Sequence, residues 1–376
     1  MSQGNSSSRP PVIAQMIGRF GGGGAERLAY NLALALAETG AKSICIAVRD
    51  AGGYAAQGGV PVEVHALSAD RSIGSRVRAA LRLRKLLINE KVDVLHVHGS
   101  STIVLCYLVL RTMWRRPQVW FTWHDSGGLP EGSQYRDRIV RRAIRSCQRI
   151  FGSSQGVADR LQTVLGGNRR VEVFRNGVPM RDATERCDSP EPNILWLARM
   201  VPTKDPQIVI RAAARLATEG LRFKLIMAGD ALPAQQAYAD ETRKLAERLG
   251  IADRVQFPGW LDDVAIDQLY REGAIGVQSS LTEGLSMTLL EQMMAGLAIV
   301  ATDVGDTRVA IVNEQTGLLI SATDEPALTH ALRRLVIDIP FRCRLAATAR
   351  QQATAYFSLK AMATTALRLL GSHDER

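Results

Sequence analysis

Residues 279–305 contain the pattern that most constrains the fold of this chain. A short apolar run over 273–280 has the length of a buried strand, and a second such run covers 298–304. Between the two runs, Ser286 is a typical helix N-cap and Gly296 a typical glycine after a helix end. Because a helix of this kind joins neighbouring parallel strands, the segment predicts a strand, a helix and a second parallel strand in an α/β sheet.

The loop before this helix is predicted to bind a ligand. It follows the carboxyl end of a parallel strand, where open α/β sheets bind ligands, and the free N–H groups after Ser286 would stabilise a phosphate. Glu283 precedes the helix, and Glu291 lies inside it among apolar neighbours, so that its carboxylate needs a polar partner such as a ribose hydroxyl. The alternative is that Glu283 is a loop charge and Glu291 a buried, satisfied helix carboxylate.

The spacing of seven residues between Glu283 and Glu291, the Glu-Gly pair that begins it and the segment AGLAIVATDVG after it resemble a known signature. It is the donor-site signature of retaining GT-B glycosyltransferases of family 4, and the resemblance covers nearly the whole chain. It implies an α/β fold of two Rossmann-like domains that face each other across a cleft, with the donor nucleotide held by the second domain. The last helix would cross back to the first domain.

The predicted domain organisation follows from this resemblance and from a polar, proline-containing linker over 181–192. Residues 1–11 are predicted to be a disordered tail. Residues 12–184 are predicted to form an N-terminal, acceptor-side Rossmann-like domain. Residues 185–355 would form the C-terminal nucleotide-sugar-binding domain, and 356–376 a helix that returns to the first domain. Helices are also predicted over 325–347 and 360–370.

Length and composition agree with two α/β domains. The 376 residues, 46% hydrophobic and 22% charged, are typical of a globular protein and argue against a fibre or a disordered chain. The five cysteines are widely spaced, which favours reduced thiols over a zinc site. No segment is long and apolar enough to span a bilayer, and the N-terminus lacks a signal-peptide core, so a cytoplasmic protein is predicted.

Basic residues are concentrated in the first half. Residues 71–170 contain 19 Lys and Arg against 6 Asp and Glu, a balance of 19 − 6 = +13, whereas the whole chain carries +10. Part of this charge lies on a predicted basic amphipathic helix over 71–91, which either packs on the sheet with its Arg in water or contacts the anionic inner face of a membrane. Nucleic acid is a weaker alternative partner, because no stacking platform or DNA-binding motif is present.

The chain begins with a strand over 12–18, a glycine loop over 21–24, a helix over 25–39 and a strand over 44–48. No frame supplies the G-x-G-x-x-G fingerprint, which disfavours an NAD-dependent oxidoreductase, although Asp50 could bind a ribose. The segment GGGGAER resembles the GGAER that opens many family 4 enzymes. The resemblance places Gly23, Gly24 and Glu26 at the cleft, the glycines at the donor and Glu26 on the acceptor side; a tight turn without a ligand is the alternative.

Three histidines lie in or at the end of two predicted strands of the first half. His96 and His98 share one face of the strand over 92–98 and are predicted to be structural rather than a metal pair, since no third ligand is near in sequence. His124 ends the strand over 118–122 and, with Asp125, matches the T-x-H-D segment of the family. The resemblance places His124 beside the donor sugar, where it would act as a polar contact or proton acceptor, and Asp125 on the acceptor side.

Two cations follow the strand over 193–198. Arg199 ends this strand and Lys204 precedes the next helix, in a segment that matches the family pattern G-R-x-x-x-x-K-G with Ala198 and Asp205 in place of its glycines. Two such cations can hold a diphosphate in place of a divalent metal. The alternative is two solvated loop charges.

The function implied by the resemblance is the transfer of a hexosyl residue from a UDP- or GDP-linked sugar to a hydroxyl of a glycan or lipid-linked acceptor. Retention at the anomeric carbon, no metal and no cofactor are expected, and bacterial envelope or exopolysaccharide synthesis is the expected setting. Arg199 and Lys204 would stabilise the leaving diphosphate, together with the backbone of Gly284, Leu285 and Ser286. Glu283 would hold sugar hydroxyls and Glu291 the ribose. A GT-B epimerase or hydrolase is the main alternative.

Overall fold

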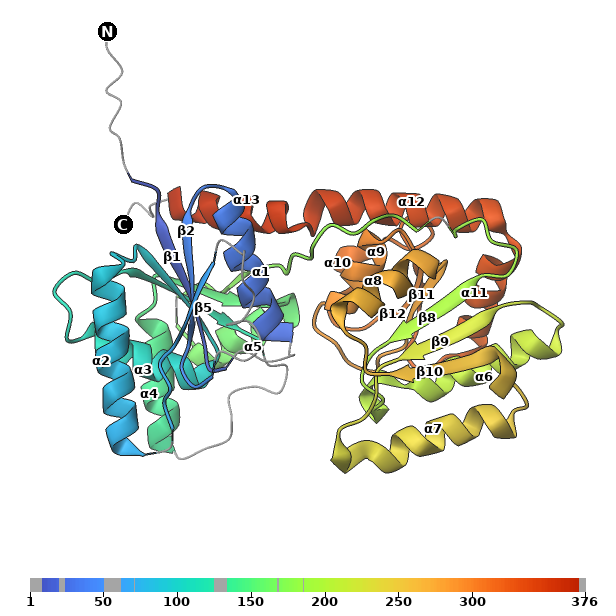
Figure 1. Ribbon diagram of the computed structural model, residues 1–376, viewed down its shortest axis with the longest axis horizontal. Helices are drawn as coiled ribbons and strands as arrows, with labels where there is room; N and C mark the ends of the chain where they lie inside the picture. Colours follow the sequence, from blue (N-terminus) through green and yellow to red (C-terminus); the bar gives the residue numbers. More distant parts are fainter. Residues whose placement is uncertain are drawn as a thin grey trace, which may run out of the picture. The chain divides into compact units, whose positions relative to one another are not determined.

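A computed structural model describes residues 9–19, 24–50, 62–70, 72–124, 134–167, 169–184 and 186–371. Contacts between Cα atoms divide the chain into two compact units (Figure 1). Unit 1 runs to Asn176 and resumes at Met362, and unit 2 covers Gly177–Ala361. The domain boundaries predicted at 184 and 355 stay predictions. Gly23, Asp125 and most of the predicted tail lie outside the described residues.

Unit 1 is built on a seven-stranded parallel sheet with the order β3-β2-β1-β4-β5-β6-β7. Its strands are β1 (Val12–Ile17), β2 (Lys42–Ala47), β3 (Glu63–Ala66), β4 (Val94–His98), β5 (Gln118–Trp123), β6 (Arg149–Gly152) and β7 (Glu172–Val173). Its helices include α1 (Gly24–Glu38), α2 (Ile73–Asn89), α3 (Ser100–Leu110), α4 (Gln134–Arg145) and α5 (Gln155–Leu165). The strand order reverses between β1 and β4, and at such a point an open sheet leaves a crevice beyond its strand ends.

The two faces of this sheet differ in polarity. Helices α2, α3 and α4 lie on one face (Figure 1), where Met16, Leu95 and Phe121 belong to one apolar cluster with them. Helix α1 covers the other face. It forms a second apolar cluster there with Ile17 and Cys45 of the strands. Because strand side chains alternate between faces, Gln15, His96, His98 and Thr122 point away from the large apolar cluster and form a buried polar group of their own.

Unit 2 is built on a six-stranded parallel sheet with the order β10-β9-β8-β11-β12-β13. Its strands are β8 (Asn193–Leu197), β9 (Lys224–Ala228), β10 (Val255–Gly259), β11 (Ile275–Gln278), β12 (Ala298–Thr302) and β13 (Leu318–Ile320). Its helices are α6 (Pro206–Thr218), α7 (Gln236–Arg248), α8 (Asp263–Glu272), α9 (Met287–Met294), α10 (Thr307–Ala310), α11 (Glu325–Ile337) and α12 (Ile339–Tyr356), and α13 (Leu359–Gly371) continues into unit 1. Here the strand order reverses between β8 and β11.

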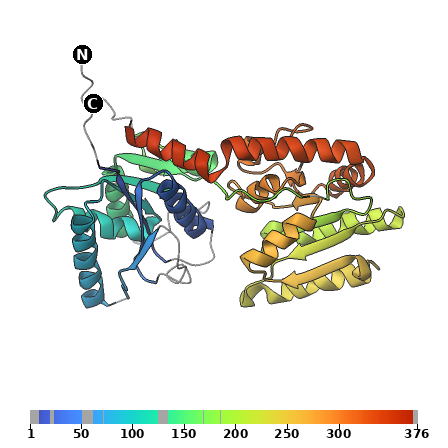
Figure 2. The same ribbon diagram turned by 45° about the horizontal axis from the view of Figure 1, so that its top comes forward.

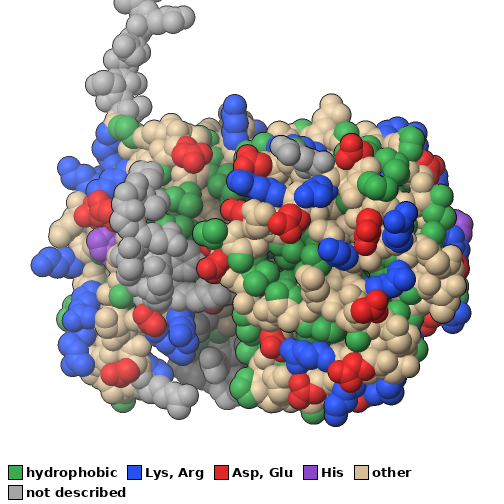
Figure 3. Space-filling model, turned by 45° about the vertical axis from the view of Figure 1, so that its right-hand side comes forward, with side chains coloured by type: hydrophobic (Ala, Val, Ile, Leu, Met, Phe, Trp, Pro, Cys, Tyr) green, Lys and Arg blue, Asp and Glu red, His purple; other side chains and the backbone are tan. Residues whose placement is uncertain are grey.

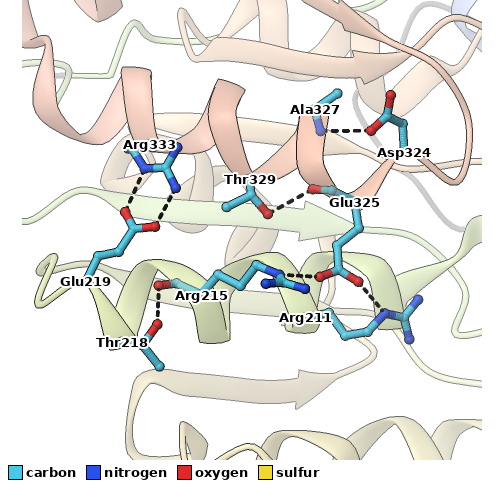
Figure 4. A network of polar contacts seen from close by, with 9 residues as sticks. All are labelled: Arg211, Arg215, Thr218, Glu219, Asp324, Glu325, Ala327, Thr329 and Arg333. Carbon is cyan, nitrogen blue, oxygen red and sulfur yellow. Dashed lines mark hydrogen bonds and ion pairs between the residues drawn. The ribbon is translucent and has the colours of Figure 1, made fainter.

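Ion pairs join α6 to α11 (Figure 4). The Glu325 carboxylate accepts hydrogen bonds from Arg211 Nε at 3.1 Å and from Arg215 Nε at 2.6 Å. Arg333 Nε donates to Glu219 at 2.6 Å further along both helices. These pairs are partly exposed, and each alone contributes little to the stability of the fold. As a network they hold α6 against α11, and the first turn of α6 follows the loop of Lys204.

The prediction of one helix over 325–347 is wrong, because the chain forms two helices there. Asp338 leaves the helical conformation with φ −90° and ψ 83°, and its side chain accepts a hydrogen bond from Phe341 N at 3.0 Å, which caps α12. Pro340 occupies the first turn of α12, where its missing N–H costs nothing. Helix α12 then packs along α9 and β12, and Figure 2 shows it as the long red helix of unit 2.

Candidate functional site

Two loops at the reversal point of unit 2 carry three charged residues of the predicted donor site. Strands β8 and β11 are neighbours in the sheet, and their carboxyl ends lead into the loops of Arg199 and Lys204 and of Glu283. The structure brings two of these residues together, because Lys204 Nζ forms an ion pair with Glu283 Oε1. Both side chains are 19% exposed, so this pair is largely removed from water. Arg199 is exposed and forms no ion pair with the part of the chain that the structure describes.

Hydrogen bonds fix the backbone of both loops. Ser279 Oγ donates to the carbonyl oxygen of Lys204 at 2.8 Å, and Leu281 N donates to that of Thr203 at 2.9 Å. From the neighbouring strand β12, Thr302 Oγ1 donates to the carbonyl oxygen of Ser280 at 2.6 Å. The position of the Lys204–Glu283 pair is therefore set by strand ends rather than by the two side chains alone.

Gly305, three residues after β12, lets the Glu283 loop pack closely. Its φ of +55° lies in the left-handed region, and a Cβ at this position would lie 2.0 Å from the carbonyl oxygen of Glu283 and 2.8 Å from that of Gly284. The next residue donates from Asp306 N to the Gly284 carbonyl oxygen at 3.0 Å. Gly305 was part of the sequence motif. The sequence did not show, however, that the Glu283 loop can pack here only because Gly305 has no side chain.

Helix α9 begins and ends where the sequence predicted. Ser286 caps it by accepting a hydrogen bond from Leu289 N at 3.3 Å, and Gly296 follows its end with φ +78°. Leu285 is buried and Gly284 half-buried, so the turn between Glu283 and the helix is anchored by an apolar side chain. The N–H groups of the first turn point toward this loop end, where they would favour an anion.

Glu291 has partners different from those of Glu283. It is 3% exposed, and its Oε2 accepts a hydrogen bond from Tyr270 Oη at 3.1 Å. Arg181 Nη2 lies 3.6 Å from Glu291 Oε1, and the Arg181 guanidinium stands 4.9 Å over the Tyr270 ring while it also pairs with Asp267. Tyr270 and Arg181 are thus polar partners of the kind that a buried helix carboxylate needs. Nothing in the sequence indicated that Arg181 and Tyr270 would contact Glu291.

The three histidines of unit 1 are close together. His98 Nδ1 lies 2.9 Å from His124 Nε2, and His98 Nε2 lies 3.0 Å from Gln15 Oε1. His96 Nε2 is bonded separately, to Thr122 Oγ1 at 2.7 Å. Burial lowers the pKa of His96 to about 3 and that of His124 to about 4, and it places the pKa of His98 well below the usual value, so all three rings are neutral near pH 7.

The other predicted residues of unit 1 are only partly described. Gly24 begins α1 and is exposed, and Glu26 lies half-buried in its first turn. Gly23 and Asp125 fall outside the described residues. Within the described ranges, no group of three or more His, Cys, Asp or Glu side chains could hold a metal ion.

Both halves of the chain match models of known protein families. A family model described as "Glycosyltransferase Family 4" matches residues 22–181, and one described as "Glycosyl transferases group 1" matches residues 182–352. The lipopolysaccharide core biosynthesis glycosyltransferase LpsE of Rhizobium meliloti is 27% identical over 93% of this chain and 96% of its own length. The D-inositol 3-phosphate glycosyltransferase 2 of Catenulispora acidiphila is 32% identical, but the match covers only 55% of this chain and 49% of that protein.

Solved structures with the same architecture are numerous. Anabaena HepE in complex with UDP superposes with a TM-score of 0.80 at 20% identity and covers 96% of this chain and 100% of its own. The apo form of the lipopolysaccharide outer core galactosyltransferase WaaB superposes with a TM-score of 0.69 at 15% identity and covers 96% and 99%. At these identities the superpositions concern the fold, and they confirm the predicted two-domain α/β architecture. Since the two family models adjoin at residues 181 and 182 and between them span residues 22–352, the chain is a GT-B glycosyltransferase of family 4, an enzyme that transfers a sugar from a nucleotide sugar.

Proposed function

We propose that the enzyme transfers a hexosyl residue from a UDP- or GDP-linked sugar to a hydroxyl group of a glycan or lipid-linked acceptor, with retention at the anomeric carbon. The observation that carries this proposal is the Lys204–Glu283 ion pair, which lies at the strand-order reversal of unit 2, beside the N-terminus of α9. A lysine, a carboxylate and a helix N-terminus at one strand edge offer a cation for phosphate and an acceptor for sugar hydroxyls.

Each side chain has a defined part in this proposal. Lys204 and Arg199 stabilise the charge on the leaving diphosphate, together with the amides of Gly284, Leu285 and Ser286, so that no metal ion or cofactor is required. Glu283 then binds sugar hydroxyls.

Glu291 binds the ribose. A carboxylate accepts up to about four hydrogen bonds, so this role is compatible with the contacts to Tyr270 and Arg181.

The residues of unit 1 act on the sugar and the acceptor. His124 is a polar contact or proton acceptor beside the sugar, which its neutral ring permits. Gly23 and Gly24 complete donor binding, and Glu26 and Asp125 belong to the acceptor side, as the family resemblance implies. We assign no protein nucleophile, because the leaving phosphate can take the acceptor proton on the front face of the sugar.

The proposed setting is bacterial envelope or exopolysaccharide synthesis. The relative LpsE, which this chain matches over 96% of its length, is named for lipopolysaccharide core biosynthesis. The same name favours a transferase over the alternative of a GT-B epimerase or hydrolase, which would release an epimerised nucleotide sugar or a free sugar instead of a glycoside.

Donor turnover tests the proposed reaction. The enzyme is incubated with UDP- and GDP-hexoses, with and without EDTA, in the presence of short glycan and lipid-linked acceptors, and nucleotide release and the anomeric configuration of the product are measured. We expect release from one nucleotide class, no effect of EDTA, and a product that keeps the anomeric configuration of the donor. Inversion, dependence on a metal ion, or a product without a new glycosidic bond would each contradict the corresponding part of the proposal.

We further propose that helix α2 contacts an anionic membrane surface. Ile73, Val77 and Leu81 form an apolar stripe at helical spacing and are 81%, 54% and 62% exposed, although the opposite side of α2 already packs on the sheet. Exposed arginines flank this stripe, and Figure 3 shows basic side chains along one edge of unit 1. In the described part of the chain, no helix has the length and hydropathy needed to cross a bilayer. An apolar stripe with basic flanks is typical of a helix that lies on a membrane surface.

Flotation with vesicles that contain phosphatidylglycerol tests this contact. We expect the wild-type protein to float at low salt and less at high salt, since each basic residue at the surface contributes about 1 kcal/mol. Leu81→Asp should abolish flotation. Val264→Asp, at a valine of unit 2 that is even more exposed than Leu81, is the matched control and should leave flotation unchanged. A wild-type protein that floats at neither salt concentration would rule out the contact.

A further inference from the structure

Three side chains from three neighbouring strands form one hydrogen-bonded chain that ends at His124. Gln15 belongs to β1, His98 to β4 and His124 follows β5, and these strands lie side by side in the sheet of unit 1. Gln15 Oε1 lies 3.0 Å from His98 Nε2, and His98 Nδ1 lies 2.9 Å from His124 Nε2. The rings of His98 and His124 are stacked at 27°, with their centroids 5.2 Å apart. Gln15 and His98 are buried and have no part in the proposed contacts with the donor or acceptor.

The donor and acceptor properties of these groups determine the direction of each hydrogen bond. An amide oxygen only accepts hydrogen bonds, so His98 Nε2 must carry a proton and donate it to Gln15 Oε1. A neutral imidazole has one donor and one acceptor nitrogen, and therefore His98 Nδ1 accepts. His124 Nε2 must then donate to His98 Nδ1, which leaves His124 Nδ1 with its lone pair. The orientation of one buried glutamine amide thus determines the tautomer of a histidine two strands away.

We propose that Gln15 and His98 are positioning residues for sugar transfer, which hold His124 in one ring orientation and in the tautomer protonated at Nε2. His124 Nδ1 is then the atom that accepts a hydrogen bond or a proton from a hydroxyl of the sugar or acceptor. The inference rests on the proposed role of His124 in the reaction. It adds two residues whose contribution passes through His124 rather than through contact with a substrate.

His96 provides a contrast within the same buried group. It lies on the same strand face as His98, with ring centroids 4.2 Å apart, but its Nε2 bonds to Thr122 Oγ1 at 2.7 Å. A hydroxyl both donates and accepts, so this bond does not select a tautomer as an amide oxygen does. Thr122→Val therefore removes a buried hydrogen bond from the neighbouring histidine while it leaves the chain from Gln15 to His124 complete.

The first test reads the tautomer directly in the full-length wild-type protein. Histidine is labelled with ¹⁵N, the ring nitrogens are observed by long-range proton–nitrogen correlation at pH 7, and the signals of His124 and His98 among the six histidines are assigned from His124→Gln and His98→Gln. We expect His124 and His98 both to be protonated at Nε2 and unprotonated at Nδ1. A His124 ring protonated at Nδ1, or one that exchanges between both tautomers, would overturn the proposal without the need for any variant at Gln15.

The second test removes the acceptor atom of Gln15, where the series of hydrogen bonds begins. Gln15→Met keeps the volume of the side chain but removes the acceptor, and we expect mixed tautomers of His124 and a fall in kcat of about tenfold or more, with the donor KM within about twofold of wild type. Thr122→Val should change neither the His124 tautomer nor kcat. A Gln15→Met protein with the wild-type tautomer, or a fall in kcat of equal size in Thr122→Val, would contradict the positioning role.

The His124→Gln variant separates the proposed role of His124 from its positioning by Gln15 and His98. If His124→Gln transfers sugar as fast as wild type, the proposed role of His124 is wrong, whatever the spectra show. If His124→Gln is inactive and the wild-type ring is protonated at Nδ1, the role of His124 stands and the positioning by Gln15 and His98 is overturned.

Discussion

Replacement of Glu283 by glutamine is expected to lower kcat for sugar transfer by about 100-fold or more, with a small change in the donor KM. The Glu283 carboxylate lies against Lys204 in the loop after β11, and the backbone of that loop is fixed by hydrogen bonds at Ser280 and Leu281. Glutamine keeps the shape of the side chain but loses the charge and one acceptor oxygen. The variant therefore removes electrostatic interactions with the sugar while the loop stays in place.

Lys204→Met is expected to lower kcat/KM by about 1,000-fold, because the cation would stabilise charge that develops on the leaving diphosphate. Since the two side chains are in contact, the double variant should lose much less than the product of the two single effects.

Steady-state kinetics with the donor identified in the turnover experiment measures these losses. Lys244→Met, at an exposed lysine of α7, is the matched control and should stay within about twofold of wild type. Single variants of Glu283 and Lys204 that keep half of the wild-type kcat/KM would show that the pair is not part of the site.

Gly305→Ala is expected to lower kcat/KM by about 100-fold or more, although it adds only one methyl group outside the predicted binding residues. The added Cβ would lie 2.0 Å from the Glu283 carbonyl oxygen, and backbone atoms cannot rotate away as a side chain can. The Glu283 loop must therefore shift, and a displacement of about 1 Å at a reacting centre can cost about 100-fold in rate.

Gly250→Ala is the matched control for this change. Gly250 also has a positive φ, +70°, but nothing lies within 4 Å of a Cβ placed there, so the variant carries the backbone strain of about 1 to 2 kcal/mol without the collision. We expect Gly250→Ala to keep wild-type kinetics with a small loss in thermal stability. Equal kcat/KM values for the two alanine variants would show that the close packing at Gly305 does not position Glu283.

Local signals in the sequence predicted the elements around the donor loops well. Ser286 and Gly296 are short-range signals, since a cap bonds within its own first turn and a glycine relieves strain at its own φ, and both occupy the predicted places. Asp338 and Pro340 are signals of the same kind, but the apolar periodicity over 325–347 outweighed them, and one helix was predicted where two exist. The spacing of apolar residues in α2 did not show which of them pack on the sheet and which form the exposed stripe.

By itself the sequence determined which loops follow parallel strands, and therefore which segments carry Arg199, Lys204, Glu283 and His124. Only the tertiary structure decided which of these side chains meet. Lys204 and Glu283 are 79 positions apart, and Gln15 and His98 are 83 apart. Both pairs form because the order of strands reverses between β8 and β11 and between β1 and β4, which places the ends of distant strands next to each other. Strand order depends on how all helices pack on both faces of a sheet, and no short stretch of residues contains that information.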